Sequence, residues 1–196
     1  MGRVKRVAVT GGIGSGKSTF CRLLSDYGGA PIYDSDTRAK EIMNSSEEVR
    51  GEIVALFGPE AYDEQGLNRR HIASIAFGSA SVLERLNAIV HPRVVADFER
   101  WAEESGCDYV ILESALLFTS PLMGHYDLAV VVDAPLDVRV ERCVSRDGAT
   151  PEEVRARIGR QMSAEQMRQR ADRVVEADGR DLMPQVADID RLIRTL

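Results

Sequence analysis

The segment that decides the fold is RVAVTGGIGSGKST, residues 6–19. Its first five residues form a short, valine-containing run that predicts a buried strand. A glycine-rich turn follows, and a stretch from about Lys17 to Tyr27 predicts a helix that stops at Gly28-Gly29. A strand that passes through a turn into a helix is the start of an alternating α/β fold.

The turn at residues 11–19 fits the phosphate-binding pattern of Gly, four residues, Gly, Lys and then Ser or Thr. Glycines let backbone N–H groups approach phosphates, and the helix N-terminus also faces the anion. Lys17 supplies charge for the β and γ phosphates, and the Ser18 hydroxyl can ligate Mg²⁺. A chance glycine turn is the alternative, but a preceding strand and a following helix are the context that confirms the motif. Nucleoside-triphosphate binding is therefore predicted at Gly12, Ile13, Gly14, Ser15, Gly16, Lys17, Ser18 and Thr19.

The rest of the chain alternates short apolar runs with longer amphipathic ones. Continuous β-branched runs are typical of parallel strands covered on both faces. Strands are expected at residues 31–33, 109–112, 128–132 and 174–175. Helices are expected at 136–145 and 182–196, and two more begin behind the capping residues Thr150 and Ser163. The sequence predicts an α/β, P-loop NTPase fold, with a parallel sheet flanked by helices.

Two insertions interrupt this alternation. Residues of about 35–105 are almost wholly helical in pattern, with a capping box at Ser45 and Glu48 and a final helix from Arg93 to Ser105. The basic segment of about 139–171 forms a smaller insertion. We expect a single kinase-sized domain whose core is about 1–34, 106–138 and 172–196.

Composition limits the possible classes of protein. The chain has 196 residues, and 25 Lys and Arg against 31 Asp and Glu give a net charge of −6, which argues against a nucleic-acid-binding surface. No stretch approaches the length of a membrane-spanning helix. Three widely spaced cysteines form neither a metal-binding pattern nor a disulfide framework, so a reducing cytoplasm is expected and the thiols are predicted to be buried. We expect a monomer or a weak homo-oligomer.

Three carboxylates follow predicted strands. Asp34 and Asp36 come directly after the second strand, and Glu113 ends the third. Ligands bind beyond the carboxyl ends of parallel strands, where a carboxylate can orient a hydroxyl acceptor and take its proton. Helix capping is an equally good interpretation of the aspartate pair. Glu113 is placed to help hold Mg²⁺, directly or through water.

Arginines crowd the segment after the fourth strand. A solvated helix face is one interpretation, because acidic residues are interspersed among them. The other is a lid that closes over the transferring phosphoryl group and neutralises its charge. Arg142 and Arg146 are the best candidates for this role because they lie four residues apart on one helical face.

Three classes of nucleotide-binding protein fit the motif: a small-molecule kinase, a switch GTPase and a motor-like ATPase. The Asn-Lys-x-Asp run expected of a GTPase is absent from the sequence, and a motor would usually need a longer chain. Small size, a helical insertion and a basic later segment together favour a kinase.

The whole chain resembles the dephospho-coenzyme A kinases. Residues 9–19 are similar to that family's phosphate loop, and 34–36 to its Asp-x-Asp. Residues 67–70 and 86–92 are similar to its Leu-Asp-Arg and Ile-x-His-Pro signatures, and Arg142, Arg146-Asp147, Arg157-Ile158 and Gln161 match its lid pattern.

The resemblance implies ATP-dependent phosphorylation of the ribose 3′-hydroxyl of dephospho-coenzyme A, with Mg²⁺, as the last step of coenzyme A synthesis. It implies that Asp36 is the catalytic base, acting with Lys17, Arg142 and Arg146. The implied substrate-binding residues are Asp34, Arg69, His91 and Glu113. Taken alone, a His before Pro is more often a packed turn residue.

The chain departs from the family pattern at a few places: Ala115 and Thr119 stand where Pro and Glu are usual, Glu113 where Asp is usual, Arg139 where Gln is usual, and 176–179 where an Asn-containing run contacts adenine. Two other functions stay open. One is a kinase of another small alcohol or nucleoside, and the other is a regulatory NTPase module without an acceptor.

Overall fold

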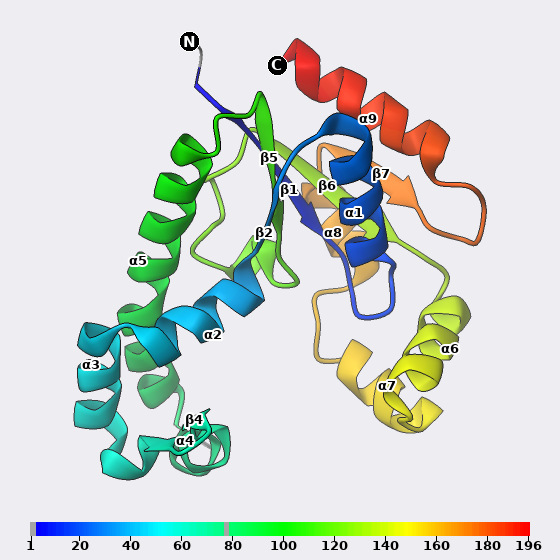
Figure 1. Ribbon diagram of the computed structural model, residues 1–196. Helices are drawn as coiled ribbons and strands as arrows, with labels where there is room; N and C mark the ends of the chain where they lie inside the picture. The colour runs from blue at the N-terminus through cyan, green and yellow to red at the C-terminus, as the bar shows by residue number, and fades with distance from the viewer. Residues whose placement is uncertain (1–2, 77–78) are drawn as a thin grey trace. The chain divides into compact units, whose positions relative to one another are not determined.

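The computed structural model describes residues 3–76 and 79–196 (Figure 1). Residues 1–2 of the expected core and 77–78 of the expected helical insertion lie outside the described residues. The chain forms two compact units: one contains the chain up to Asp34 together with Trp101–Leu196, and the other contains Ser35–Arg100.

The first unit is built on a five-stranded parallel sheet in the order β2-β5-β1-β6-β7. Its strands are β1 Lys5–Thr10, β2 Ile32–Asp34, β5 Tyr109–Glu113, β6 Leu128–Asp133 and β7 Arg173–Glu176. The central strands are buried along nearly their whole length because helices cover both faces, as the β-branched runs predicted. The predicted α/β fold with a parallel sheet is confirmed.

Helices α1 and α9 pack side by side on one face of this sheet (Figure 1). The helices that belong wholly to this unit are α1 Lys17–Gly28, α6 Leu136–Asp147, α7 Pro151–Ile158, α8 Ala164–Arg170 and α9 Met183–Thr195, with a 3-10 turn at Leu117–Thr119. Helix α1 ends as predicted, because Gly29 is left-handed (φ 69°) and its N–H caps the carbonyl of Ser25. The capping boxes predicted at Thr150 and Ser163 are both present.

The second unit is mainly helical, with its own apolar cluster around Val49, Ile53 and Phe57. It contains α2 Ser35–Ser45, α3 Glu47–Phe57, a 3-10 turn at Pro59–Ala61, the two-stranded ribbon of β3 Tyr62–Asp63 and β4 Gly66–Leu67, α4 Arg69–Ala76 and most of α5 Ala80–Glu104. The ribbon was not predicted, because its strands have only two residues each and leave no alternating pattern.

Two predictions in this region are wrong. The cap of α3 is Ser46, whose Oγ accepts from the N–H of Val49; Ser45 ends α2 instead and donates to the carbonyl of Glu41. Helix α5 begins at Ala80 rather than at Arg93, so Pro92 lies inside it. Proline usually ends a helix because it lacks an N–H and displaces a carbonyl. Here the helix continues through Pro92, and Val90 and Val94 on either side of it are buried.

Candidate active site

The phosphate loop joins β1 to α1 at the carboxyl end of the central strand. Gly14 and Gly16 have φ values of 77° and 95°, which only glycine adopts without strain. Gly14 is needed for a second reason: a Cβ at this position would overlap the backbone carbonyl of Arg139 on α6. The glycines therefore both shape the loop and let α6 approach it.

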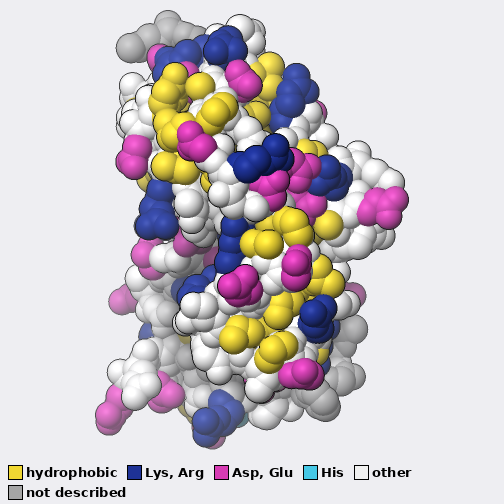
Figure 2. Space-filling view, turned by 90° about the vertical axis from the view of Figure 1, so that its right-hand side faces the viewer, with side chains coloured by type: hydrophobic (Ala, Val, Ile, Leu, Met, Phe, Trp, Pro, Cys, Tyr) yellow, Lys and Arg dark blue, Asp and Glu magenta, His cyan; other side chains and the backbone are white. Residues whose placement is uncertain are grey.

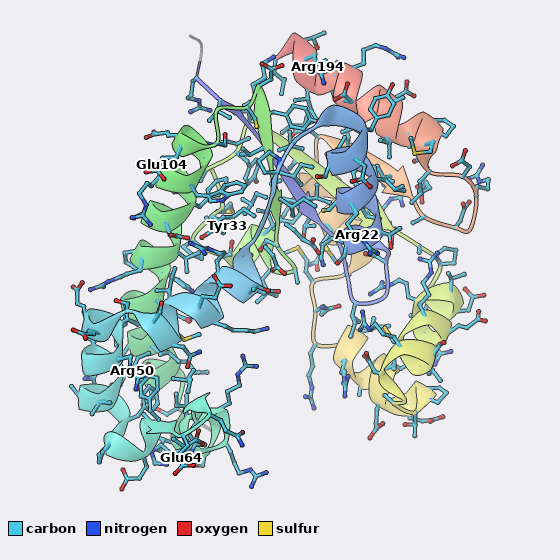
Figure 3. The ribbon with its side chains drawn as sticks, viewed as in Figure 1. Arg22, Tyr33, Arg50, Glu64, Glu104 and Arg194 are labelled. Atoms are coloured by element: carbon cyan, nitrogen blue, oxygen red, sulfur yellow. The ribbon has the colours of Figure 1, made fainter. Side chains whose placement is uncertain are left out.

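A cavity of about 640 Å³ lies over this loop. Its walls include every loop residue that the sequence predicted, together with Arg142 and Arg146 from α6. Four further residues line it that were not predicted as site residues: Gly11, Arg22, Ala115 and Gln161. Arg22 projects from α1 (Figure 3), and its Nε donates to the carbonyl of Ser18. Its spacing of four residues from Ser18 places both on one helical face, which is the signal that could have identified it.

Lys17, Ser18 and Glu113 form the polar centre of the site. The Lys17 Nζ and the Ser18 Oγ both donate to the same oxygen of Glu113, at 2.9 and 2.6 Å. The Lys17 and Glu113 side chains are only 18% and 12% exposed, so this ion pair is largely screened from water. Glu113 was predicted to bind substrate or Mg²⁺. In the structure it accepts hydrogen bonds from Lys17, the predicted phosphate ligand, and from Ser18, the predicted metal ligand.

The first of the predicted aspartates lies at the same end of the sheet. Asp34 is the last residue of β2 and pairs in register with Glu113 on β5. Its neighbour Ser35 begins α2, and Asp36 lies in the first turn of that helix with an exposed side chain. Asp34 and Glu113 thus occupy adjacent strand ends, as expected from the parallel topology.

The two predicted lid arginines are bound differently. Arg142 donates to the carbonyls of Gly14 and Ser15 at 3.4 and 3.3 Å, and to the carbonyl of Ala177 at 2.8 Å. It therefore ties the phosphate loop to the segment after β7. Arg146 is exposed and forms a two-point ion pair with Asp147, which raises the pKa of Arg146 and lowers that of Asp147.

Arg139 is a charged residue of α6 for which no role was predicted. It is only 6% exposed, and its Nε donates to the carbonyl of Ile13 at 3.0 Å. Within the described part of the chain it forms no ion pair. A buried cation without a carboxylate partner is costly, and here the carbonyl of the loop residue Ile13 supplies part of the compensation.

Two predicted site residues belong to the second unit. Arg69 is the first residue of α4 and is exposed, behind Asn68, whose Oδ1 caps the helix by accepting from the N–H of His71. His91 lies within α5 and is half-buried, and this burial lowers its pKa, so the imidazole is neutral at neutral pH.

Two of the three cysteines are buried, as predicted, and all three are free. Burial, with a smaller contribution from Glu113, raises the pKa of the Cys21 thiol, so this thiol stays protonated and unreactive. Cys107 is only half-buried, which corrects the prediction for that residue, because it lies in the turn before β5 rather than in the core.

No helix among residues 3–76 and 79–196 is both long enough and apolar enough to cross a bilayer.

On the face shown in Figure 2, basic and acidic side chains are interspersed. Within the cavity over the loop, positive charge is supplied by Lys17, Arg22, Arg142 and Arg146.

The chain is similar in sequence and in structure to known proteins. The family model for dephospho-CoA kinase matches residues 5–182. A dephospho-CoA kinase of Salinibacter ruber is 42% identical over 177 residues, which cover 88% of each chain. The crystal structure of TT1252 from Thermus thermophilus matches the whole of both chains with a TM-score of 0.85 and 34% identity. A shikimate kinase from Acinetobacter baumannii shares the fold, with a TM-score of 0.56 and 16% identity over 98% of this chain and 94% of that one. From its sequence and its site, the chain belongs to the dephospho-CoA kinase family.

Proposed function

We propose that this kinase transfers the γ-phosphoryl group of ATP to the ribose 3′-hydroxyl of dephospho-coenzyme A, giving coenzyme A and ADP. The observation that carries the proposal is the pairing of Lys17 and Ser18 with one oxygen of Glu113, at the first turn of α1 and beside a cavity lined by the phosphate loop. The backbone amides of the loop and Lys17 would hold the triphosphate in this cavity.

The donor set fits Mg²⁺. Ser18 Oγ and Glu113 Oε1 are hard oxygen ligands, which Mg²⁺ prefers, and they lie within 2.6 Å of one another. Among the described residues no group of three or more His, Cys, Asp or Glu side chains forms a metal site, so phosphate oxygens and water would complete the coordination. When bound, Mg²⁺ neutralises the charge that develops on the β and γ phosphates.

The acceptor step needs a base. In the proposed reaction the ribose 3′-oxygen bonds to the γ-phosphorus while the bond from that phosphorus to the β-γ bridging oxygen breaks. The hydroxyl proton passes to the exposed carboxylate of Asp36, and the leaving electron pair stays on the β-phosphate of ADP. Asp34, Arg69 and His91 would contact the acceptor, and residues of about 35–105 would form its binding insertion.

The basic segment of about 139–171 would act as the lid. Arg146, whose present partner is the exposed Asp147, is free to exchange that carboxylate for a phosphoryl group as the lid closes. Arg142 would contribute charge from the position in which it already braces the loop.

An acceptor panel tests the proposal. Purified protein with Mg-ATP is offered dephospho-coenzyme A, adenosine, pantetheine or shikimate, and both ADP and the phosphorylated acceptor are measured. We expect turnover with dephospho-coenzyme A, and phosphorus NMR of the product should place the new phosphate on the 3′-oxygen. Lys17→Met serves as the control for contaminating kinases. Turnover of another alcohol alone would favour the broader kinase function, and hydrolysis without any acceptor would favour the regulatory NTPase.

We propose ATP and dephospho-coenzyme A as the ligands, with no nucleic acid or membrane partner, and a monomer or weak homo-oligomer. The free state of all three thiols supports a reducing cytoplasm as the compartment.

A further inference from the structure

Ile13, at the tip of the phosphate loop, contacts the basic segment of about 139–171 through its N–H, its carbonyl and its side chain. The N–H of Ile13 donates to Oε1 of Gln161 at 2.9 Å, and its carbonyl accepts from Nε of Arg139 at 3.0 Å. Its side chain packs against the apolar cluster of Val140, Cys143 and Val154. Both backbone groups and the side chain of one loop residue are therefore occupied by α6, α7 and the turn that follows them.

The neighbouring loop residues share this contact. A Cβ on Gly14 would meet the carbonyl of Arg139 and lie 2.9 Å from the Cys143 sulfur, so no side chain fits between the loop and α6. Arg142 holds the carbonyls of Gly14 and Ser15. Three successive loop residues, Ile13, Gly14 and Ser15, thus contact one stretch of α6, while the loop also lines the phosphate cavity.

We propose that Ile13 is a positioning residue for nucleotide binding: by inserting into the apolar cluster of the lid, it keeps the phosphate loop in its anion-binding shape. A glycine-rich loop without such an anchor samples many conformations. Binding of the triphosphate must then order the loop, and the entropy lost in doing so weakens the affinity. The inference rests on the proposed binding of ATP, and it is independent of which alcohol accepts the phosphate.

The chain offers a matched control. Ile158, at the end of α7, packs against the same cluster as Ile13 and is also partly buried. Ile13→Ala and Ile158→Ala remove the same atoms from the same cluster, but only the first removes the anchor of the loop. Ile13→Val keeps the branched side chain and should restore the anchor.

The test measures the Kd of a non-hydrolysable ATP analogue by calorimetry, together with the Tm of each variant. Both alanine variants should lower the Tm. If loss of the anchor leaves about a tenth of the loops in the binding shape, Ile13→Ala raises the Kd about tenfold, whereas Ile13→Val and Ile158→Ala stay within about twofold of the wild type. The KM of the acceptor should not change in any of them.

A second variant keeps the inference testable if Ile13→Ala does not fold. Gln161→Met retains the length of the side chain but cannot accept from the N–H of Ile13, and the Kd should rise about fivefold. An unchanged Kd in Ile13→Ala, or equal rises in Ile13→Ala and Ile158→Ala, would overturn the inference. Failure of the wild type to bind ATP would overturn the proposed function as well, whereas ATP binding without turnover of dephospho-coenzyme A would overturn only the acceptor.

Discussion

The two ends of the central sheet both bury charged side chains, but they use them differently. At the amino end, the hydroxyl of Tyr109 donates to Asp190 at 2.9 Å, and Arg194 on α9 (Figure 3) donates to the same carboxylate at 2.8 Å. Lys5 caps α9 by donating to the carbonyls of Ile193 and Arg194. Every one of these charged groups meets a partner within the protein.

The carboxyl end leaves binding capacity unused. Arg139 is buried without an ion pair, and the buried hydroxyl of Ser15 has no hydrogen-bond partner, among the residues that the structure describes. A polar network whose members are paired within the protein contributes stability, whereas a buried cation without a carboxylate partner favours the approach of an anion. We therefore expect substitutions of charged residues at the amino end to change folding, and those of charged residues at the carboxyl end to change catalysis with little change in folding.

The largest effect is expected for Asp36→Asn. Removing a general base typically slows a reaction by about 10²–10⁴-fold, so kcat should fall by that factor while the Kd for ATP stays close to that of the wild type. Because the side chain is exposed, the urea midpoint should shift little. Quenched-flow assays with dephospho-coenzyme A measure kcat, and calorimetry with ATP measures the Kd separately. Undiminished turnover would remove Asp36 from the mechanism.

Glu113→Gln should have the next largest effect. The amide oxygen can still accept from Lys17 or Ser18, but the charge that holds both donors is lost. Loss of a residue that orients a metal ligand typically costs about 10–100-fold in activity or metal affinity, so kcat/KM for Mg-ATP should fall by that factor. A titration of activity with Mg²⁺ should show a higher half-saturating concentration. An unchanged Mg²⁺ requirement would separate Glu113 from the metal.

Asp190→Asn tests the amino end. Its hydrogen bonds involve a charged group, so their weakening should lower the free energy of unfolding by about 2 kcal/mol at neutral pH, with kcat unchanged. Burial by itself raises the pKa of Asp190, but the hydrogen bonds from Arg194 and Tyr109 outweigh it, and the folded pKa lies below the ordinary 3.8. The stabilisation is therefore complete above pH 3.8 and is lost as the pH falls through the lower, folded pKa.

Urea unfolding between pH 3 and pH 7 gives the measurement for this variant. The difference between wild type and Asp190→Asn should be constant near neutrality and should shrink in acid, because only the wild type carries the titrating carboxylate. A difference that grows toward low pH would contradict the sign of the linkage. A large loss of kcat at neutral pH would show that the two ends are coupled.

How much of the molecule was predictable depends on how local its determinants are. The phosphate loop, the buried strands and the capped helices at Thr150 and Ser163 were predicted because short patterns specify them. Helix α5 was mispredicted because the local rule for Pro92 is overridden by tertiary packing, which buries Val90, Val94 and Phe98 of the same helix. The contacts of Arg139 and Gln161 with Ile13 join residues more than 120 positions apart, and no spacing in the sequence encodes them.

The smallest effect is expected for Ser15→Ala, and it sharpens the contrast between the two ends. The hydroxyl is buried, 1% of the residue is exposed, and this oxygen has no partner among the described residues. Because an unsatisfied buried polar group gains nothing from the fold, its removal should leave the free energy of unfolding within about 0.5 kcal/mol of the wild type or raise it. A Cβ on Gly11 would lie 2.6 Å from this oxygen, so the hydroxyl is directed toward the start of the loop. We therefore expect Ser15 to act through its backbone and the Kd for ATP to be unchanged. A higher Kd for ATP with unchanged folding would instead show that the Ser15 hydroxyl binds phosphate, and ATP would then be the missing hydrogen-bond partner of this oxygen.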